Sequence, residues 1–137
     1  MEKTIDSIAY IKIHDFDCSV EELTEKIGIE PDISWQKGDK VSNRNTDIKR
    51  KFSSWALSSG KSHTAPIDDH IDALISLIKP RYKIFKTFIK KFNGEFTIVI
   101  KSSNLANVGL TIKNDKLKFF TQLGAAIDID IYFLNSE

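Results

Sequence analysis

The stretch PIDDHIDALISLIKPRYKIFKTFIKKF, residues 66–92, determines the fold expected for this chain. Apolar residues recur along it at the three- and four-residue steps of one buried helical face. They are Ile67, Ile71, Leu74 and Ile78 before the proline, and Phe85, Phe88, Ile89 and Phe92 after it. Pro80 lacks a backbone N–H, and its ring clashes with the preceding turn of a helix. The spacing therefore predicts one long helix that Pro80 kinks, or two helices, ended by Asn93 and Gly94.

Segments with strand character lie on both sides of this helical stretch. β-branched and aromatic residues are frequent in five of them, at residues 8–14, 52–58, 96–100, 108–112 and 126–134. A turn rich in serine and asparagine separates residues 96–100 from residues 108–112, and this spacing predicts an antiparallel hairpin. Two shorter helical segments, residues 19–27 and 115–123, are each followed by a glycine that can end the helix.

The two short helices share a sequence pattern. Ser19 and Gly28 are nine positions apart, as are Asp115 and Gly124, and each helix follows a predicted strand. This indicates either an internal strand–helix–strand duplication or a chance similarity, which helix caps and helical spacing alone can produce. Together with the long helix, the pattern predicts a single α+β domain over residues 1–137, with a mostly antiparallel sheet of about five strands.

The composition is typical of one globular domain. Of the 137 residues, 41% are hydrophobic and 28% charged, with only 6 Gly and 3 Pro, which excludes collagen-like, low-complexity and disordered chains. Cys18 is the only cysteine, so no intrachain disulfide can form. The sequence has neither an apolar run long enough to cross a bilayer nor the pattern of a secretion signal. We therefore expect a cytoplasmic protein with no membrane partner.

The net charge of +1 is the sum of two segments of opposite charge. Residues 1–35 hold nine acids and three bases, a net charge of −6, whereas residues 73–94 hold six bases and no acid, a net charge of +6. On a helix, four lysines of the second segment share one face, opposite the phenylalanines; they are Lys79, Lys83, Lys86 and Lys90. A solvated helix face explains this basic stripe, and so does a contact surface for nucleic acid or an acidic protein.

A few residues are candidates for catalysis or metal binding. Asp128 and Asp130 share one side of the last predicted strand with Tyr132, and paired carboxylates can act as acid and base. Cys18, at the start of a helix, is a candidate nucleophile. Residues 63–72 hold two histidines and three aspartates, but no two histidines stand four apart on one helix, and the helix dipole explains the aspartates. We therefore expect no catalytic residue, no cofactor and no bound metal.

Short motifs extend over nearly the whole chain. Gly-Ile-x-Pro stands at residues 28–31, Lys-Gly-Asp at residues 37–39, Trp55 in the next strand, and Leu-Gly-Ala at residues 123–125 before a closing hydrophobic strand. With the long helix, this succession resembles a bacterial family of small domains of unknown function, the domain-of-unknown-function 4279 family. The family has no established catalytic residues to carry over. Its members are similar to the small immunity proteins that accompany bacterial toxins, and the resemblance therefore implies a binding role.

We therefore expect a non-enzymatic protein-binding domain, which by this analogy is a bacterial immunity protein that binds and neutralises a toxin. A nucleic-acid-binding protein that uses the basic stripe is the alternative, and an uncharacterised enzyme is a further one. The candidate partner-binding residues fall in an acidic surface, in the net basic loop of residues 30–51 and in the basic stripe. They are Asp15, Asp17, Glu21, Glu22, Glu25, Trp35, Lys37, Lys40, Lys83 and Lys86.

Overall fold

The computed structural model describes residues 2–41, 47–104 and 106–134, so residues 42–46 of the predicted basic loop lie outside the described part. In chain order the elements are β1 (Thr4–His14), α1 (Val20–Ile27), β2 (Ile33–Trp35), β3 (Ser54–Ser58), α2 (Ile67–Ile78), the 3-10 turn η1 (Lys79–Arg81), α3 (Tyr82–Lys91), β4 (Asn93–Ser103), α4 (Asn114–Leu123) and β5 (Ala126–Leu134). Pro80 lies in η1, and α2, η1 and α3 follow one another without a break, which confirms the predicted interruption of the long helix. The short strand β2 lies inside the segment predicted as a loop.

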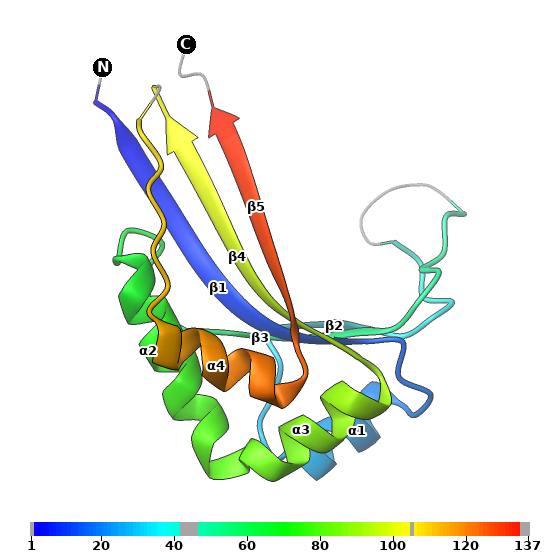
Figure 1. Ribbon diagram of the computed structural model, residues 1–137. Coiled ribbons are helices and arrows are strands. Elements are labelled where there is room, and N and C mark those ends of the chain that lie inside the picture. Colours follow the sequence, from blue (N-terminus) through cyan, green and yellow to red (C-terminus); the bar gives the residue numbers. More distant parts are fainter. Residues whose placement is uncertain (1, 42–46, 105, 135–137) are drawn as a thin grey trace.

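The five strands form one mixed sheet in the order β2-β3-β1-β4-β5 (Figure 1). All neighbouring strands are antiparallel except β4 and β5, which are parallel. The first four strands follow a β-α-β-β-α-β succession with the spatial order β4-β1-β3-β2, the arrangement of ferredoxin-like folds. The last helix, α4, then returns the chain so that β5 extends the sheet beyond β4. The single α+β domain with a mostly antiparallel five-stranded sheet is thus confirmed.

The predicted hairpin between residues 96–100 and residues 108–112 is wrong. Residues 96–100 lie in β4, but both positions beside β4 are occupied, by β1 and by β5, and residues 108–112 belong to no strand. Val108, Leu110 and Ile112 are instead partly buried against the hydrophobic core. The alternating apolar residues belong to an extended segment outside the sheet, which covers the core on the helix side.

Two strand–helix–strand units are present, but the second begins with β4 and not with the predicted strand at residues 108–112, and the strands of the two units pair differently. β1-α1-β2 and β4-α4-β5 each join parallel strands through a short helix, and both helices end at glycines with left-handed backbone, Gly28 (φ 82°) and Gly124 (φ 90°). In the first unit β3 lies between β1 and β2, whereas in the second β4 and β5 are direct neighbours. The sequence echo therefore reflects similar local structure in two different sheet environments.

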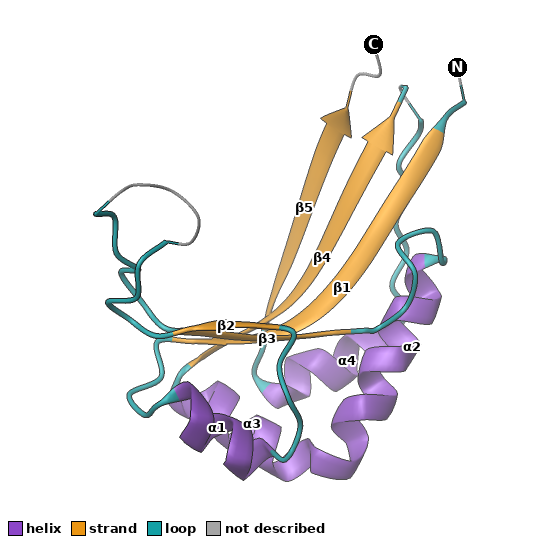
Figure 2. Cartoon of the chain, turned by 180° about the vertical axis from the view of Figure 1, so that it is seen from behind, coloured by secondary structure: helices purple, strands orange, loops and turns teal. Residues whose placement is uncertain are grey.

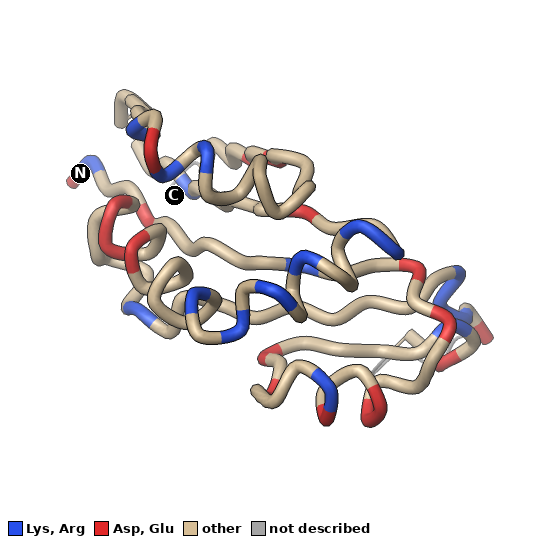
Figure 3. Tube along the Cα trace, turned by 60° about the horizontal axis from the view of Figure 1, so that its bottom comes forward, with Lys and Arg blue, Asp and Glu red and all other residues tan. Residues whose placement is uncertain are grey.

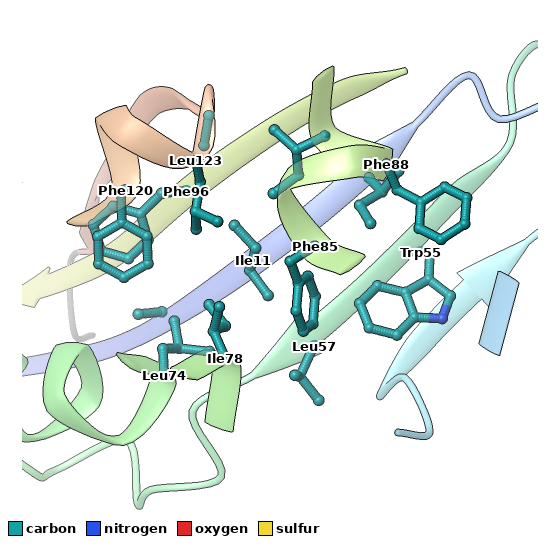
Figure 4. Close-up of a cluster of buried hydrophobic side chains, with 14 of the residues drawn as sticks. Ile11, Trp55, Leu57, Leu74, Ile78, Phe85, Phe88, Phe96, Phe120 and Leu123 are labelled. Atoms are coloured by element: carbon teal, nitrogen blue, oxygen red, sulfur yellow. The ribbon is translucent and has the colours of Figure 1, made fainter. Parts of the chain in front are cut away.

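All helices lie on one face of the sheet, and the hydrophobic core fills the space between (Figures 2 and 4). Trp55 of β3 and Phe85 of α3 are fully buried, with ring centroids 5.9 Å apart. Phe96 of β4 and Phe120 of α4 stack with centroids 3.8 Å apart. The helices do not cover the whole length of the sheet, because the ends of β1, β4 and β5 near the two termini extend beyond them (Figures 1 and 2).

Candidate interaction surface

The outer edge of β5 has an unpaired backbone in the described part of the chain. β5 is the last strand in the sheet order, and all its backbone pairing is with β4. At nine residues it is three times as long as β2, the strand at the opposite edge. A long unpaired edge presents N–H and C=O groups that can pair with another strand. The outer edge of β5 is therefore a candidate site for an added strand.

The side chains of β5 that point to the helix side are apolar and only half covered. They share this side with the core residues of β4, but the helices do not reach far enough to bury them. Ile127 is 36% exposed, Ile129 41%, Ile131 42% and Phe133 69%. Large apolar side chains that are neighbours on a surface indicate a binding site more often than isolated ones do.

The opposite side of β5 is acidic. Asp128 and Asp130 lie there, beside Glu95 and Thr97 of β4, and the Thr97 hydroxyl donates to Glu95 at 3.4 Å. Partial burial and the negative charges of Asp130 and Glu95 raise the pKa of Asp128 above its ordinary value, and Lys12 of β1 opposes this effect. A cationic group placed beside these carboxylates would relieve their repulsion.

A cleft of about 690 Å³ adjoins this surface where β1 ends and β4 begins. The His14 Nε2 atom lies 3.7 Å from a carboxylate oxygen of Glu95, and the His14 ring meets Phe52 edge-on. Burial lowers the pKa of His14, although Glu95 favours the charged form. The Nδ1 atom is buried without a hydrogen-bond partner. Because Nδ1 is buried, His14 meets the cleft through its other edge, where Nε2 faces Glu95.

A family model described as Domain of unknown function (DUF4279) matches residues 3–134, nearly the whole chain. The chain belongs to this family. Neither the curated proteins nor the solved structures contain a match to it. Because the DUF4279 description names no activity, function has to be argued from the surface itself.

The five acidic residues predicted at an interface in this DUF4279 chain are all exposed. Glu21, Glu22 and Glu25 lie on α1, while Asp15 and Asp17 lie in the turn that leads to it. The hydroxyl of Ser19, the residue before the helix, accepts a hydrogen bond from the Glu22 amide at 3.1 Å and so caps the helix. Glu21 and Glu25 line a hollow beside α1, whereas Asp15 lines the cleft that also contains Glu95.

Trp35, predicted as an interface residue, is held by contacts within its own chain. Its indole N–H donates to the Phe52 carbonyl at 2.9 Å, and the Arg50 guanidinium lies 3.9 Å from its ring centroid. The side chain is half-buried by these contacts, so only part of the ring is open to a partner. Lys37 is exposed in the following turn, and Lys40 is exposed where it forms an isolated β-bridge with Lys49.

Helix α1, from the acidic segment, and helix α3, from the basic segment, lie side by side in the helix layer (Figure 3). Arg81 joins them, because its guanidinium donates to the Gly28 carbonyl at the end of α1 at 3.3 Å. On α3, Lys83 is exposed, whereas Lys86 is half-buried with its ammonium 5.8 Å from the ring centroid of Tyr82. The acidic helix α1 and the basic helix α3, which are far apart in the sequence, are thus neighbours in space.

The histidines and aspartates near the start of α2 have separate partners. His70 is fully buried, with its Nδ1 atom 2.6 Å from the Ser59 hydroxyl. Lys116 of α4 binds Asp68 at 3.6 Å and Asp72 at 2.9 Å, and so ties α4 to α2. Across residues 2–41, 47–104 and 106–134 there is no group of three histidine, cysteine or carboxylate side chains that could hold a metal ion. Nor, in the same residues, is any helix long and apolar enough to cross a membrane.

Sequence reasoning missed two parts of this surface. It placed Asp128 and Asp130 on one side of the last strand and the isoleucines on the other, as the structure does, but gave no sign that the apolar side stays half exposed. It also did not connect His14 with Glu95, which are far apart in the sequence and meet only because β1 pairs with β4. Cys18, the candidate nucleophile, is half-buried in the turn before α1 and packs against the core.

Proposed function

We propose that this chain is a non-enzymatic protein-binding domain, and that it acts in the bacterial cytoplasm as an immunity protein that binds and neutralises a toxin. The observation that carries the proposal is the outer edge of β5, where an unpaired strand edge adjoins apolar side chains that are one-third to two-thirds exposed. Strand addition at such an edge combines main-chain hydrogen bonds with side-chain burial, and it is a recurring mode of protein recognition.

The charges of the surface support a basic protein partner. The α1 surface is acidic at Glu21, Glu22 and Glu25, and the face of β5 away from the helices is acidic at Asp128 and Asp130. A toxin that acts on nucleic acid has a basic substrate cleft, and an acidic surface placed over that cleft would block it.

The proposal is tested by co-expressing the chain with the product of the reading frame immediately upstream of its gene. We expect that product to stop growth alone, and growth to recover when the chain is present, with the two proteins eluting together. The double variant Ile129→Asp/Ile131→Asp should neither restore growth nor elute together with that product. Ile33→Asp, which alters an equally exposed isoleucine on the opposite edge strand, is the matched control and should protect fully.

If the upstream product neither binds the chain nor slows growth, the immunity role is rejected for that pair. If binding and protection survive the Ile129→Asp/Ile131→Asp change, the interface lies outside β5. Charge reversal at Glu21, Glu22 and Glu25 then decides whether the acidic α1 surface is the contact.

The lysines of α3 favour nucleic-acid binding as a second candidate function. Within the described residues, no carboxylate lies within ion-pair distance of Lys83 or Lys90, both of which are exposed. Binding of a labelled oligonucleotide should then weaken steeply with salt and fall further in the Lys83→Gln/Lys86→Gln variant, but not in Lys101→Gln, an exposed lysine on β4. A chain that binds no oligonucleotide at low salt excludes this function.

A further inference from the structure

The side chains of β5 specify what kind of strand its edge can accept. In a sheet, residues directly opposite on neighbouring strands point to the same face, with Cβ atoms about 5 Å apart. A strand added at β5 would therefore place every second side chain against Ile127, Ile129 and Ile131. The side chains between these would lie against Asp128 and Asp130.

No cation of the described chain lies directly opposite the two aspartates of this edge. Across β4, Asp128 lies opposite Thr97 and Asp130 opposite Val99, neither of which is a cation. Lys12 of β1 pairs across the sheet with Glu95, on the far side of β4 from β5. On the same face, Lys101 of β4 lies opposite Asp6 of β1 and Tyr132 of β5, and Lys12 acts on Asp128 only from two strands away. The positions directly opposite the two aspartates on the open side of β5 are therefore left for a partner.

A second copy of the chain fits this edge poorly. The antiparallel register that pairs the whole of β5 with itself sets Asp130 opposite Asp130 and Asp128 opposite Tyr132. Like charges directly opposite each other destabilise a strand pair, whereas opposite charges stabilise it. Charge complementarity therefore favours a foreign strand that carries basic residues.

We propose that β5 pairs with a strand of the protein partner in which lysine or arginine alternates with apolar residues. The basic side chains lie against Asp128 and Asp130, and the apolar ones cover Ile129 and Ile131. This inference rests on the proposed function, because it names the chemistry of the segment that a protein partner brings to the same surface.

The test uses the full chain, isotopically labelled, and three synthetic peptides of the same length as β5. The first alternates lysine with valine, the second alternates glutamate with valine, and the third has the composition of the first in scrambled order. We expect the lysine–valine peptide to shift the amide resonances of residues 126–134 and to slow hydrogen exchange of those amides that do not bond to β4. The glutamate–valine peptide should bind about tenfold more weakly, the effect of two cross-strand charge pairs changing sign.

Charge reversal provides the second arm of the experiment. The Asp128→Lys/Asp130→Lys variant should reverse the preference, so that the glutamate–valine peptide binds more tightly than the lysine–valine peptide. Glu21→Lys/Glu25→Lys on α1 changes the net charge by the same amount and should leave the preference unchanged. If the reversed variant fails to fold, the resonance shifts and exchange rates of the unaltered chain still decide the matter.

Several outcomes overturn the inference. They are equal binding of all three peptides, binding that perturbs residues outside β5, no binding, and a concentration-dependent dimer of the chain through β5 seen by sedimentation. In the growth assay, protection that persists in Asp128→Lys/Asp130→Lys would contradict this inference and leave the immunity proposal intact. Failure of the unaltered chain to protect, with peptide binding as expected, would contradict the immunity proposal instead.

Discussion

Gly94, near the start of β4, lies directly against Ile89 of α3. A Cβ atom at Gly94 would lie 2.7 Å from Cγ1 and 2.9 Å from Cβ of the isoleucine, distances that real Cβ atoms do not show. Ile89 is buried and cannot move aside without disturbing the core. The close approach fixes how the end of α3 packs on the strand that follows it.

We therefore expect Gly94→Ala to destabilise the fold by about 1–3 kcal/mol, the usual cost of forcing extra atoms into a packed core. Urea unfolding measures the difference in the free energy of unfolding. Gly109→Ala is the matched control, because a Cβ there meets no atom within 4 Å. The double variant Gly94→Ala/Ile89→Ala should be less destabilised than the sum of the two single changes, and simple additivity would contradict the proposed clash.

The hydrogen bond between Trp55 and Thr24 connects the sheet to α1. The indole N–H donates to the threonine hydroxyl at 3.1 Å, and Trp55 is fully buried. Thr24→Val keeps the shape but leaves the N–H without a partner, so we expect a loss of about 1–3 kcal/mol in unfolding free energy. Thr24→Ser retains the hydroxyl and should lose much less. Equal stability of the valine and serine variants would show that this bond adds nothing.

Stability should decrease as the pH falls, because His70 is buried as the neutral imidazole. Burial lowers the pKa of His70 below the ordinary value of 6.5, so the unfolded chain binds the proton more readily than the folded one. The stability contributed by the neutral side chain is therefore present above that value and is lost as the pH falls below it, towards the lowered pKa of the folded chain. His14, whose pKa burial also lowers, adds to the same trend.

His70→Asn isolates the contribution of this residue, since its side chain can still bond to Ser59. Thermal unfolding followed at several pH values should show a shallower decline in this variant than in the unaltered chain. Identical declines would mean that His70 does not control the acid sensitivity of the fold.

Asp128 should have the opposite effect on how stability depends on pH. Partial burial, Asp130 and Glu95 raise its pKa in the folded chain, so the folded state gains stability as the pH falls through that raised pKa. At pH 7 the charged side chain opposes folding, and Asp128→Asn should be more stable than the unaltered chain. The difference in unfolding free energy between Asp128→Asn and the unaltered chain should become smaller as the pH is lowered. Asp17→Asn, an exposed aspartate outside this cluster, controls for the loss of one negative charge, and a less stable Asp128→Asn would contradict the repulsion.

Local sequence signals predicted local structure well. Ser19 caps α1 and Gly28 ends it because both roles depend only on neighbouring backbone groups, and the proline at position 80 separates α2 from α3 for the same reason. The strand β5 was predicted at residues 126–134, where the structure has it.

The pairing between distant segments could not be predicted from local sequence signals. The alternation at residues 108–112 suits a strand, but whether a segment joins the sheet depends on which positions beside β4 are already filled, and β1 and β5 fill both. The isoleucines of β5 likewise reveal their common face but not its exposure, because that depends on how far the helices extend. The candidate surface is therefore a property of the assembled sheet.

The contact between Arg81 and Gly28 affects how the proposed partner would approach the chain. It holds the acidic α1 next to the basic α3, so the electric fields of the two helices largely cancel at a distance. At physiological ionic strength, charges further apart than about 8 Å are in any case largely screened. We expect the rate of association to depend little on ionic strength, because the charges of this protein act on a partner only after the two surfaces have come close.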